Sequence, residues 1–248
     1  MNSLEVRSVC KTYDEGNTEV LRGLTFTVGP SEFVALYGPN GCGKSTVLNI
    51  IAGFVPPSAG QVAAPSRGAG RGGVGFIFQD FRSSLFPWLT VAQNIRLGTR
   101  EPRPADAPSP ADVVDLLGLT EHAKKYPYQL SGGLCQLTAI ARVLVLHSPL
   151  VLMDEPLSAL DYHYNATILD LLGKLHADLD NAFLMISHDV DDALLLSDRV
   201  LVLSKRPARL VGEVSVDLPS PRSSDLRFCS EFPQLRSRVF ELFSEGLK

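Results

Sequence analysis

The chain has 248 residues, of which 45% are hydrophobic and 20% charged, with a formal net charge of −4. This length and composition indicate a folded globular protein and exclude a disordered chain. The small acidic excess gives no electrostatic basis for a nucleic-acid-binding surface, so we expect no nucleic-acid partner. The four cysteines lack the paired spacing of zinc or redox sites, which indicates reduced thiols.

The sequence shows no segment that would target or anchor the chain to a membrane. Residues 1–17 are polar and acidic and lack the apolar core of a secretory signal. The longest apolar stretches, at 143–146 and 149–153, are far shorter than the roughly 20 residues of a membrane-spanning helix. If the protein works at a membrane, we expect another chain to provide the span.

The first predicted elements are strands. Residues 4–9 and 23–28 alternate apolar and polar side chains, as half-buried strands do. Residues 33–37 are continuously apolar, like a strand covered on both faces, and lead into a glycine-rich loop and a helix. Further buried strands are predicted at 74–78, 149–153, 182–186 and 199–203, with helical patterns between them. This order predicts an α/β fold with a mainly parallel sheet and an antiparallel edge.

Residues 84–147 show helical signals and no convincing strand. Ser109 and Pro110 suit the cap and first turn of one helix there, after a proline-rich loop. We therefore predict a helical subdomain at 84–147, inserted between two parts of a core domain at 1–83 and 148–248.

Near the end of the chain, an apolar stripe at helical spacing predicts a terminal helix. The stripe comprises Leu235, Val239, Leu242 and Phe243.

Residues 38–45, GPNGCGKS, fit the phosphate-binding pattern G-x-x-x-x-G-K-(S/T) between a strand and a helix. The glycines let successive N–H groups face one anion, and the helix N-terminus adds its dipole. Lys44 is expected to reach the β- and γ-phosphates, and the Ser45 hydroxyl to join the shell of a Mg²⁺ ion. A glycine turn without chemical meaning would not explain this lysine and hydroxyl. The candidate nucleotide-binding residues of the loop are Gly38, Pro39, Asn40, Gly41, Cys42, Gly43, Lys44, Ser45 and Thr46.

Cys42 lies within this loop of N–H donors, next to Lys44. Such surroundings predict a lowered pKa and a reactive thiol. The alternative is that Cys42 is only a small residue that fits the loop.

A second chemical motif is the acidic pair at the end of PLVLMDEP, residues 149–156. A buried strand that ends in carboxylates delivers them to the sheet edge where α/β proteins bind ligands. Asp154 suits Mg²⁺ bound through its water shell, and Glu155 suits a base that orients and deprotonates an attacking water. The alternative is an ordinary acidic turn.

A third motif opens the segment LSGGLCQLTAIAR, residues 130–142. Serine and glycine are among the poorer helix formers, yet an apolar helical pattern follows directly. Small residues at a helix start leave its N–H groups uncovered, and these groups form an anion site. Because Lys44 already marks one phosphate site, we expect Ser131, Gly132 and Gly133 to close on the nucleotide of another copy.

With these motifs in this order, the chain resembles the ATP-binding-cassette ATPases across nearly its full length. The resemblance implies a P-loop nucleoside-triphosphatase fold, ATP and Mg²⁺ as cofactors, ATP hydrolysis, and a head-to-tail dimer. It also implies further roles: Tyr13 stacks on adenine, Gln79 contacts Mg²⁺ and the attacking water, Asp161 of the segment 158–161 lies at the dimer interface, and His188 contacts the γ-phosphate. Glu155, His188 and Gln79 are thus the expected catalytic residues.

Residues 86–95 and 191–210 resemble the nitrate, sulfonate and taurine importers of that family. This finer resemblance implies transmembrane permease subunits, an extracytoplasmic solute-binding protein, and a peripheral position on the cytoplasmic face of the membrane. Relatives usually carry Gln or Met and then Arg where this chain has Leu134 and Leu137, so weaker dimer closure or turnover is expected.

Residues 80–95 are the candidate contact for a permease helix because large apolar groups gather beside Gln79. These groups are Phe81, Leu85, Phe86, Trp88 and Leu89. For any single one of these residues, the core of the helical subdomain is an equally expected place.

Two other functions remain open from the sequence. One is a soluble ABC ATPase outside transport, for example in iron–sulfur assembly. The other is a P-loop kinase or switch GTPase, although neither uses LSGG and the chain has no guanine-reading N-K-x-D motif. The sequence does not identify a transported solute, nor whether the second ATPase subunit is identical.

Overall fold

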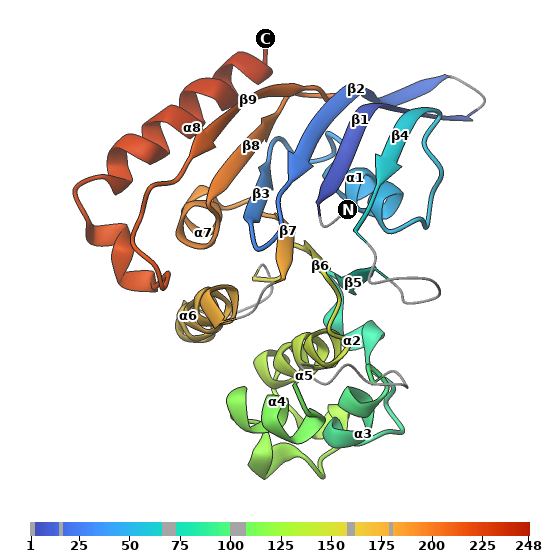
Figure 1. The fold of residues 1–248 in the computed structure, drawn as a ribbon, viewed down its shortest axis with the longest axis vertical. Coiled ribbons are helices and arrows are strands. Elements are labelled where there is room, and N and C mark those ends of the chain that lie inside the picture. Colours follow the sequence, from blue (N-terminus) through green and yellow to red (C-terminus); the bar gives the residue numbers. More distant parts are fainter. Residues whose placement is uncertain (1–2, 15–16, 66–72, 100–107, 158–161, 179–180) are drawn as a thin grey trace.

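The computed structural model describes residues 3–14, 17–65, 73–99, 108–157, 162–178 and 181–248. Within these residues, a six-stranded sheet forms the centre and a three-stranded sheet covers part of it (Figure 1). A group of helices lies beyond one end of the central sheet. None of the helices in the described ranges combines the length and the apolar character that a membrane crossing requires.

The central sheet is mainly parallel, as predicted. Its strand order is β5 (Val74–Ile77), β6 (Leu150–Asp154), β7 (Ala182–Ile186), β3 (Phe33–Tyr37), β8 (Arg199–Leu203) and β9 (Leu210–Ser215). The first five strands are parallel, and β9 pairs with β8 in the antiparallel direction. The sequence analysis did not predict β9, which forms the antiparallel edge of this sheet.

The two alternating N-terminal strands belong to a sheet of their own. Here β1 (Leu4–Tyr13) pairs with β2 (Thr18–Val28) on one side and with β4 (Ala59–Ala63), also not predicted, on the other. Apolar side chains of β1 and β2 share one core with those of α1 (Lys44–Ile51) and of the central sheet. The antiparallel strands therefore form a layer on the central sheet, because both faces of that sheet are apolar and each needs a cover.

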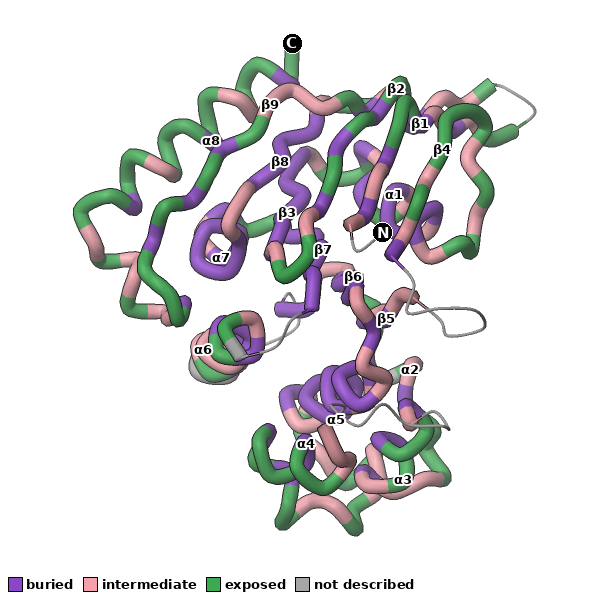
Figure 2. Tube along the Cα trace, viewed as in Figure 1, coloured by how far each residue is buried: buried purple, intermediate pink, exposed green. Residues whose placement is uncertain are grey.

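The alternation of β3 shows how both faces are buried. Phe33, Ala35 and Tyr37 belong to one hydrophobic core, whereas Val34 and Leu36 belong to the other. Successive side chains of a strand point to opposite faces, so a strand that is apolar throughout fits a sheet covered on both sides. Figure 2 shows this continuous burial along the central strands.

The core on the other face includes side chains of α6 (Tyr162–Asp178), α7 (Val190–Leu196) and α8 (Phe232–Gly246). Helix α8 packs against β8 and β9 (Figure 1). It carries the predicted apolar stripe, in which Val239 is fully buried, and thereby confirms the predicted terminal helix.

Between β5 and β6 the described residues contain helices and turns. The helices are α2 (Phe81–Ser84), α3 (Val91–Arg96), α4 (Pro110–Leu116) and α5 (Gly132–Val145), with 3₁₀ turns at Thr120–His122 and Pro127–Gln129. Ser109 caps α4 and Pro110 occupies its first turn, as predicted. Residues 101–107 of the predicted proline-rich loop lie outside the described residues. The division of the chain at residues 84 and 147 stays a prediction.

Candidate active site

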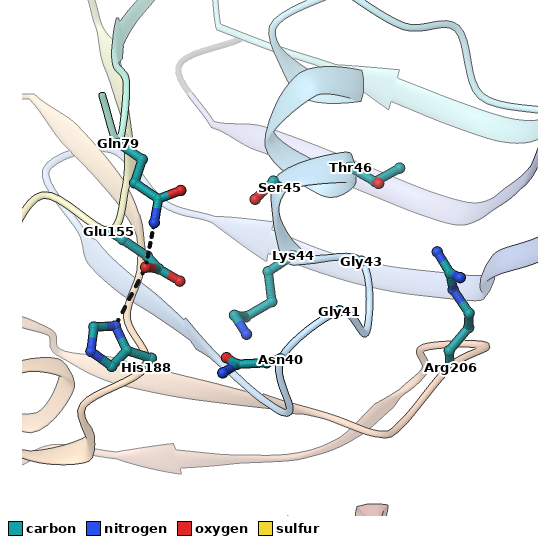
Figure 3. Close-up of a pocket in the computed structure, with 10 residues that line it drawn as sticks. All are labelled: Asn40, Gly41, Gly43, Lys44, Ser45, Thr46, Gln79, Glu155, His188 and Arg206. Carbon is teal, nitrogen blue, oxygen red and sulfur yellow. Dashed lines mark hydrogen bonds and ion pairs between the residues drawn. The ribbon is translucent and has the colours of Figure 1, made fainter. Parts of the chain in front are cut away.

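A pocket of about 530 Å³ lies beside the phosphate loop (Figure 3). It brings together half of the candidate site residues singled out in the sequence, from segments that are far apart in the chain. The lining residues are Asn40, Gly41, Gly43, Lys44, Ser45, Thr46, Gln79, Glu155, His188 and Arg206. Arg206 is the one lining residue that the sequence analysis missed.

The loop between β3 and α1 has the backbone that a phosphate loop needs. Gly41 and Gly43 have φ angles of 73° and 122°, which side chains rarely permit. A Cβ atom at Gly43 would also lie 2.7 Å from Cγ1 of Val20. The Val47 N–H donates to the Gly43 carbonyl at 3.0 Å, so the helix begins directly where the loop ends. These glycines let the chain turn tightly beneath β2 and enter α1.

Lys44 is curled into this loop. Its Nζ donates to the carbonyl oxygens of Gly38 at 2.8 Å and Pro39 at 3.0 Å, and the residue is only 6% exposed. A buried ammonium next to open N–H groups at a helix start provides positive charge for an anion. The loop therefore fits the phosphates of a nucleotide.

Ser45, which lines the pocket, is hydrogen-bonded to Asp154, which does not. The Ser45 hydroxyl donates to Oδ1 of Asp154 at 3.3 Å. Burial raises the pKa of the Asp154 carboxyl, against the hydrogen bond from Ser45, and the negative charge of Glu155 raises it further. A partly buried carboxylate paired with a hydroxyl is an oxygen donor set that fits Mg²⁺ shared with phosphate oxygens.

Glu155, Gln79 and His188 form the opposite wall of the pocket. Nε2 of Gln79 donates to Oε2 of Glu155 at 2.9 Å, and Nδ1 of His188 lies 3.5 Å from the same oxygen (Figure 3). The Glu155 backbone donates to the Ile186 carbonyl and has a φ of 49°, an unusual angle for glutamate. Such strain is common at functional sites, and the arrangement can accept a proton from a water in the pocket.

Ser131 is the N-cap of α5, and its hydroxyl accepts a hydrogen bond from the Leu134 N–H at 3.3 Å. The helix thus starts on Ser-Gly-Gly because the serine is a good N-cap. Ser131, Gly132 and Gly133 are not among the residues that line the pocket. Leu137 is 7% exposed and belongs to the hydrophobic core, so this chain uses a leucine to pack α5.

Beyond Ser131, Gly132 and Gly133, five further predicted site residues are not among those that line the pocket: Tyr13, Gly38, Pro39, Cys42 and Asp154. Tyr13 ends β1, is 37% exposed, and has Nζ of Lys11 at 4.8 Å from its ring centroid. It is not a lining residue. Asp161, with the segment 158–161, lies outside the described residues.

Residues 21–158, more than half of the chain, match the profile of the ABC transporter family. The chain belongs to this family.

Several relatives of this ABC ATPase carry names that describe a function. The aliphatic sulfonates import ATP-binding protein SsuB of Bacillus licheniformis is 36% identical over 97% of this chain and 94% of its own length. An SsuB of Pseudomonas syringae is 43% identical over 84% and 83% of the two chains. The nitrate import ATP-binding protein NrtC of Synechococcus elongatus is 39% identical over 84% of this chain and 32% of its own length.

Solved structures agree with the fold. The dimeric structure of MJ0796, a bacterial ABC transporter cassette, superposes with a TM-score of 0.72 at 28% identity. It covers 87% of this chain and 100% of that cassette. The same cassette in a post-hydrolysis state bound to ADP and phosphate gives a TM-score of 0.71. The predicted fold and the predicted ABC-type ATPase are thereby confirmed.

The predicted lowering of the Cys42 pKa is wrong. Burial raises the pKa of its thiol, against the positive charge of Lys44 and the hydrogen bonds of the loop. The residue is 2% exposed and packs in the core formed with β1, β2 and α1. Desolvation disfavours the thiolate more than the nearby charge favours it, so the ABC ATPase uses Cys42 as a small core residue.

The apolar groups of residues 80–95 divide into two sets. Phe81 and Leu85 are 7% and 4% exposed and pack against α5, so for these two the alternative of a place in the subdomain core holds and the partner surface does not. Leu89 is partly buried. Phe86 and Trp88 are 41% and 69% exposed, and their rings form an edge-to-face pair at 5.4 Å. We call Phe86 and Trp88 the exposed aromatic pair.

Arg206 lies in the loop between β8 and β9. It could have been suspected from the sequence, because it closely follows a buried strand, and residues after parallel strands gather at one sheet edge. The sequence does not show that β8 pairs directly with β3, the strand before the phosphate loop. This pairing brings Arg206 to the pocket.

Proposed function

We propose that this ABC ATPase is the ATP-hydrolysing subunit of an importer for a small sulfonate- or nitrate-like solute. The support comes from the relatives named as sulfonate and nitrate import proteins, two of which the chain covers over most of their length. In this proposal the chain sits on the cytoplasmic face of the membrane and binds transmembrane permease subunits. An extracytoplasmic solute-binding protein delivers the solute.

The observation that carries the proposed mechanism is that the pocket contains Lys44 but none of Ser131, Gly132 and Gly133. One chain therefore presents half of a nucleotide site and, elsewhere, a second helix start suited to an anion. A second copy, head to tail, would complete the site. The dimeric relative MJ0796 supports this arrangement.

Each residue has a proposed task within that dimer. The loop and Lys44 hold the β- and γ-phosphates, Glu155 accepts a proton from the attacking water, and Gln79 positions that water. His188 contacts the γ-phosphate. Tyr13 stacks on adenine and Asp161 contacts the partner copy. Ser45, Asp154 and Gln79 would hold Mg²⁺, which would neutralise charge on the phosphates.

ATP would join the two copies because its γ-phosphate contacts both half-sites. After hydrolysis the two half-sites no longer share one triphosphate, so the dimer reopens. We propose that this closing and opening drives the permease, and that the helical segment 84–147 transmits the movement.

The dimer is tested with Ser131→Arg in a Glu155→Gln background. Glu155→Gln alone should form dimers on addition of ATP, measured by light scattering after size exclusion. The double variant should still bind a fluorescent ATP analogue but remain monomeric, because arginine fills the helix start. Ser230→Arg is the matched control, since Ser230 is an exposed serine that is remote from the motif in sequence. ATP-dependent dimers of the Ser131→Arg variant, or full turnover by a strictly monomeric sample, would contradict the proposal.

The solute is tested by reconstituting the ATPase with its permease and solute-binding protein in lipid vesicles. ATP hydrolysis and uptake should both rise with alkyl sulfonates or with nitrate, and not with a neutral sugar. Failure of the chain to copurify with any membrane protein would favour the alternative, an ABC ATPase outside transport.

The exposed aromatic pair is our proposed permease contact. The pair follows Gln79 closely in the sequence. Trp88 is more than two-thirds exposed, so its ring is accessible to another protein. Trp88→Ser should lower copurification with the permease, whereas Phe228→Ser should not, although Phe228 is 80% exposed. Equal retention by both variants would exclude the pair from the interface.

A further inference from the structure

Arg206 is an exposed cation that lines the nucleotide pocket and has no task in the mechanism above. Among the described residues, no hydrogen bond or ion pair engages its guanidinium. Other arginines of the chain differ: Arg199, Arg222 and Arg236 each contact a carboxylate. An arginine that faces a phosphate-binding pocket without a protein partner is available to a ligand.

The backbone around Arg206 is held firmly. The Lys205 N–H donates to the Gly246 carbonyl at the end of α8, at 2.9 Å. The Ala208 N–H donates to the Val20 carbonyl of β2, at 2.8 Å. Helix α8 and strand β2 therefore hold the backbone on either side of Arg206. This fixes the position of its Cα atom at the nucleotide pocket.

Arg206 lies at the opposite end of the pocket from Glu155 and His188, with Lys44 and Gly43 between them (Figure 3). A triphosphate whose γ-phosphate lies at Glu155 and whose β-phosphate lies at Lys44 runs along the pocket toward Arg206. Its α-phosphate and nucleoside then approach Arg206. The charge of Arg206 also acts on the loop, since it opposes the increase that burial causes in the pKa of Cys42.

We propose that Arg206 binds the α-phosphate of the nucleotide. A guanidinium is always charged and matches the oxygens of a phosphate group with its planar fork of donors. The α-phosphate is present in ATP and in ADP and is not changed by hydrolysis. Arg206 therefore determines nucleotide affinity and takes no part in bond cleavage. The inference rests on the proposed orientation of the γ-phosphate toward Glu155.

The test compares Arg206→Ala with Arg209→Ala, since Arg209 is an exposed arginine of the same loop that does not line the pocket. Dissociation constants for ATP and ADP are measured with fluorescent competitors, ATP in the Glu155→Gln background. Arg206→Ala should weaken both nucleotides equally, roughly 5- to 20-fold, and raise KM while kcat stays within about twofold. Arg206→Lys should lie between, and Arg209→Ala should match the unaltered chain.

Added salt should reduce the loss caused by Arg206→Ala, because the contact is between exposed charges. Unaltered ADP affinity in Arg206→Ala would overturn the proposal, and a loss confined to ATP would place Arg206 at the γ-phosphate instead. A loss that disappears with 2′-deoxy-ATP would indicate a ribose contact and would also overturn it. Failure of the proposed base is detected separately, as normal turnover of Glu155→Gln.

Discussion

Nδ1 of His188 lies 3.5 Å from Oε2 of Glu155, the same oxygen that accepts the hydrogen bond from Gln79. Gln79, Glu155 and His188 follow β5, β6 and β7, which are neighbours in the parallel sheet. The carboxyl ends of parallel strands lie at one edge, so three residues distant in sequence meet there. The first two predictions below concern Glu155 and His188, which meet at Oε2 of Glu155.

Glu155→Gln should bind ATP with near-normal affinity and hydrolyse it roughly 10²- to 10⁴-fold more slowly, because an amide cannot accept the proton of the water. Phosphate release and nucleotide binding measure the two effects separately. Glu241→Gln, on the exposed side of α8, is the control and should behave as the unaltered chain. Near-normal turnover in Glu155→Gln would refute the assignment of the base.

His188→Ala should lower turnover by about tenfold or more, because the imidazole contacts the reacting phosphate in the proposed site. The side chain is 49% exposed, so its removal should leave the thermal unfolding midpoint nearly unchanged. His122→Ala, in the helical segment, provides the control. A decrease of less than severalfold would remove His188 from the catalytic residues.

Cys42 should react slowly with iodoacetamide at pH 8, since burial both covers the thiol and raises its pKa. Peptide mapping over time should show Cys10 and Cys229, which are partly exposed, labelled first. Addition of ATP should change the rate at Cys42 little. Preferential labelling of Cys42 would show that the loop activates the thiol after all.

Asp198 should make the stability of the fold depend on acid pH. Burial alone would raise the pKa of its carboxyl, but hydrogen bonds from His176, the Phe33 N–H and Arg222 lower it to about 2. Because the folded pKa lies below the unfolded value, the contribution to stability is complete above about pH 4. It is lost as the pH falls through 2.

Asp198→Asn tests this contribution by urea unfolding. At pH 7 the free energy of unfolding should fall by about 1–3 kcal/mol, since Arg222, only 4% exposed, loses a charged partner. The unpaired arginine accounts for this loss, because Asp198 is 39% exposed and solvent screens its charge. The deficit should shrink toward pH 3. Asp217→Asn, at an exposed position, should show no deficit at either pH.

Local patterns in the sequence determined the parts of this protein that depend on neighbours along the chain. The apolar strand at 33–37 followed by GPNGCGKS defines a phosphate loop, because strand, glycine turns and helix start are adjacent in sequence. The helix after Ser131 is similar, since its cap bonds three residues ahead. Alternation and apolar runs likewise predicted seven strands that the structure contains.

Tertiary structure alone decided what depends on distant partners. The strand β4 contains a glycine and exposed side chains, and it forms because β1 offers an edge. The thiol of Cys42 is desolvated by β1, β2 and α1 together, which no local pattern records. Arg206 reaches the pocket because β8 lies beside β3. The burial of a side chain, its pKa and its distance from other groups depend on residues that the fold brings together from remote segments. These properties therefore follow only from the packed structure.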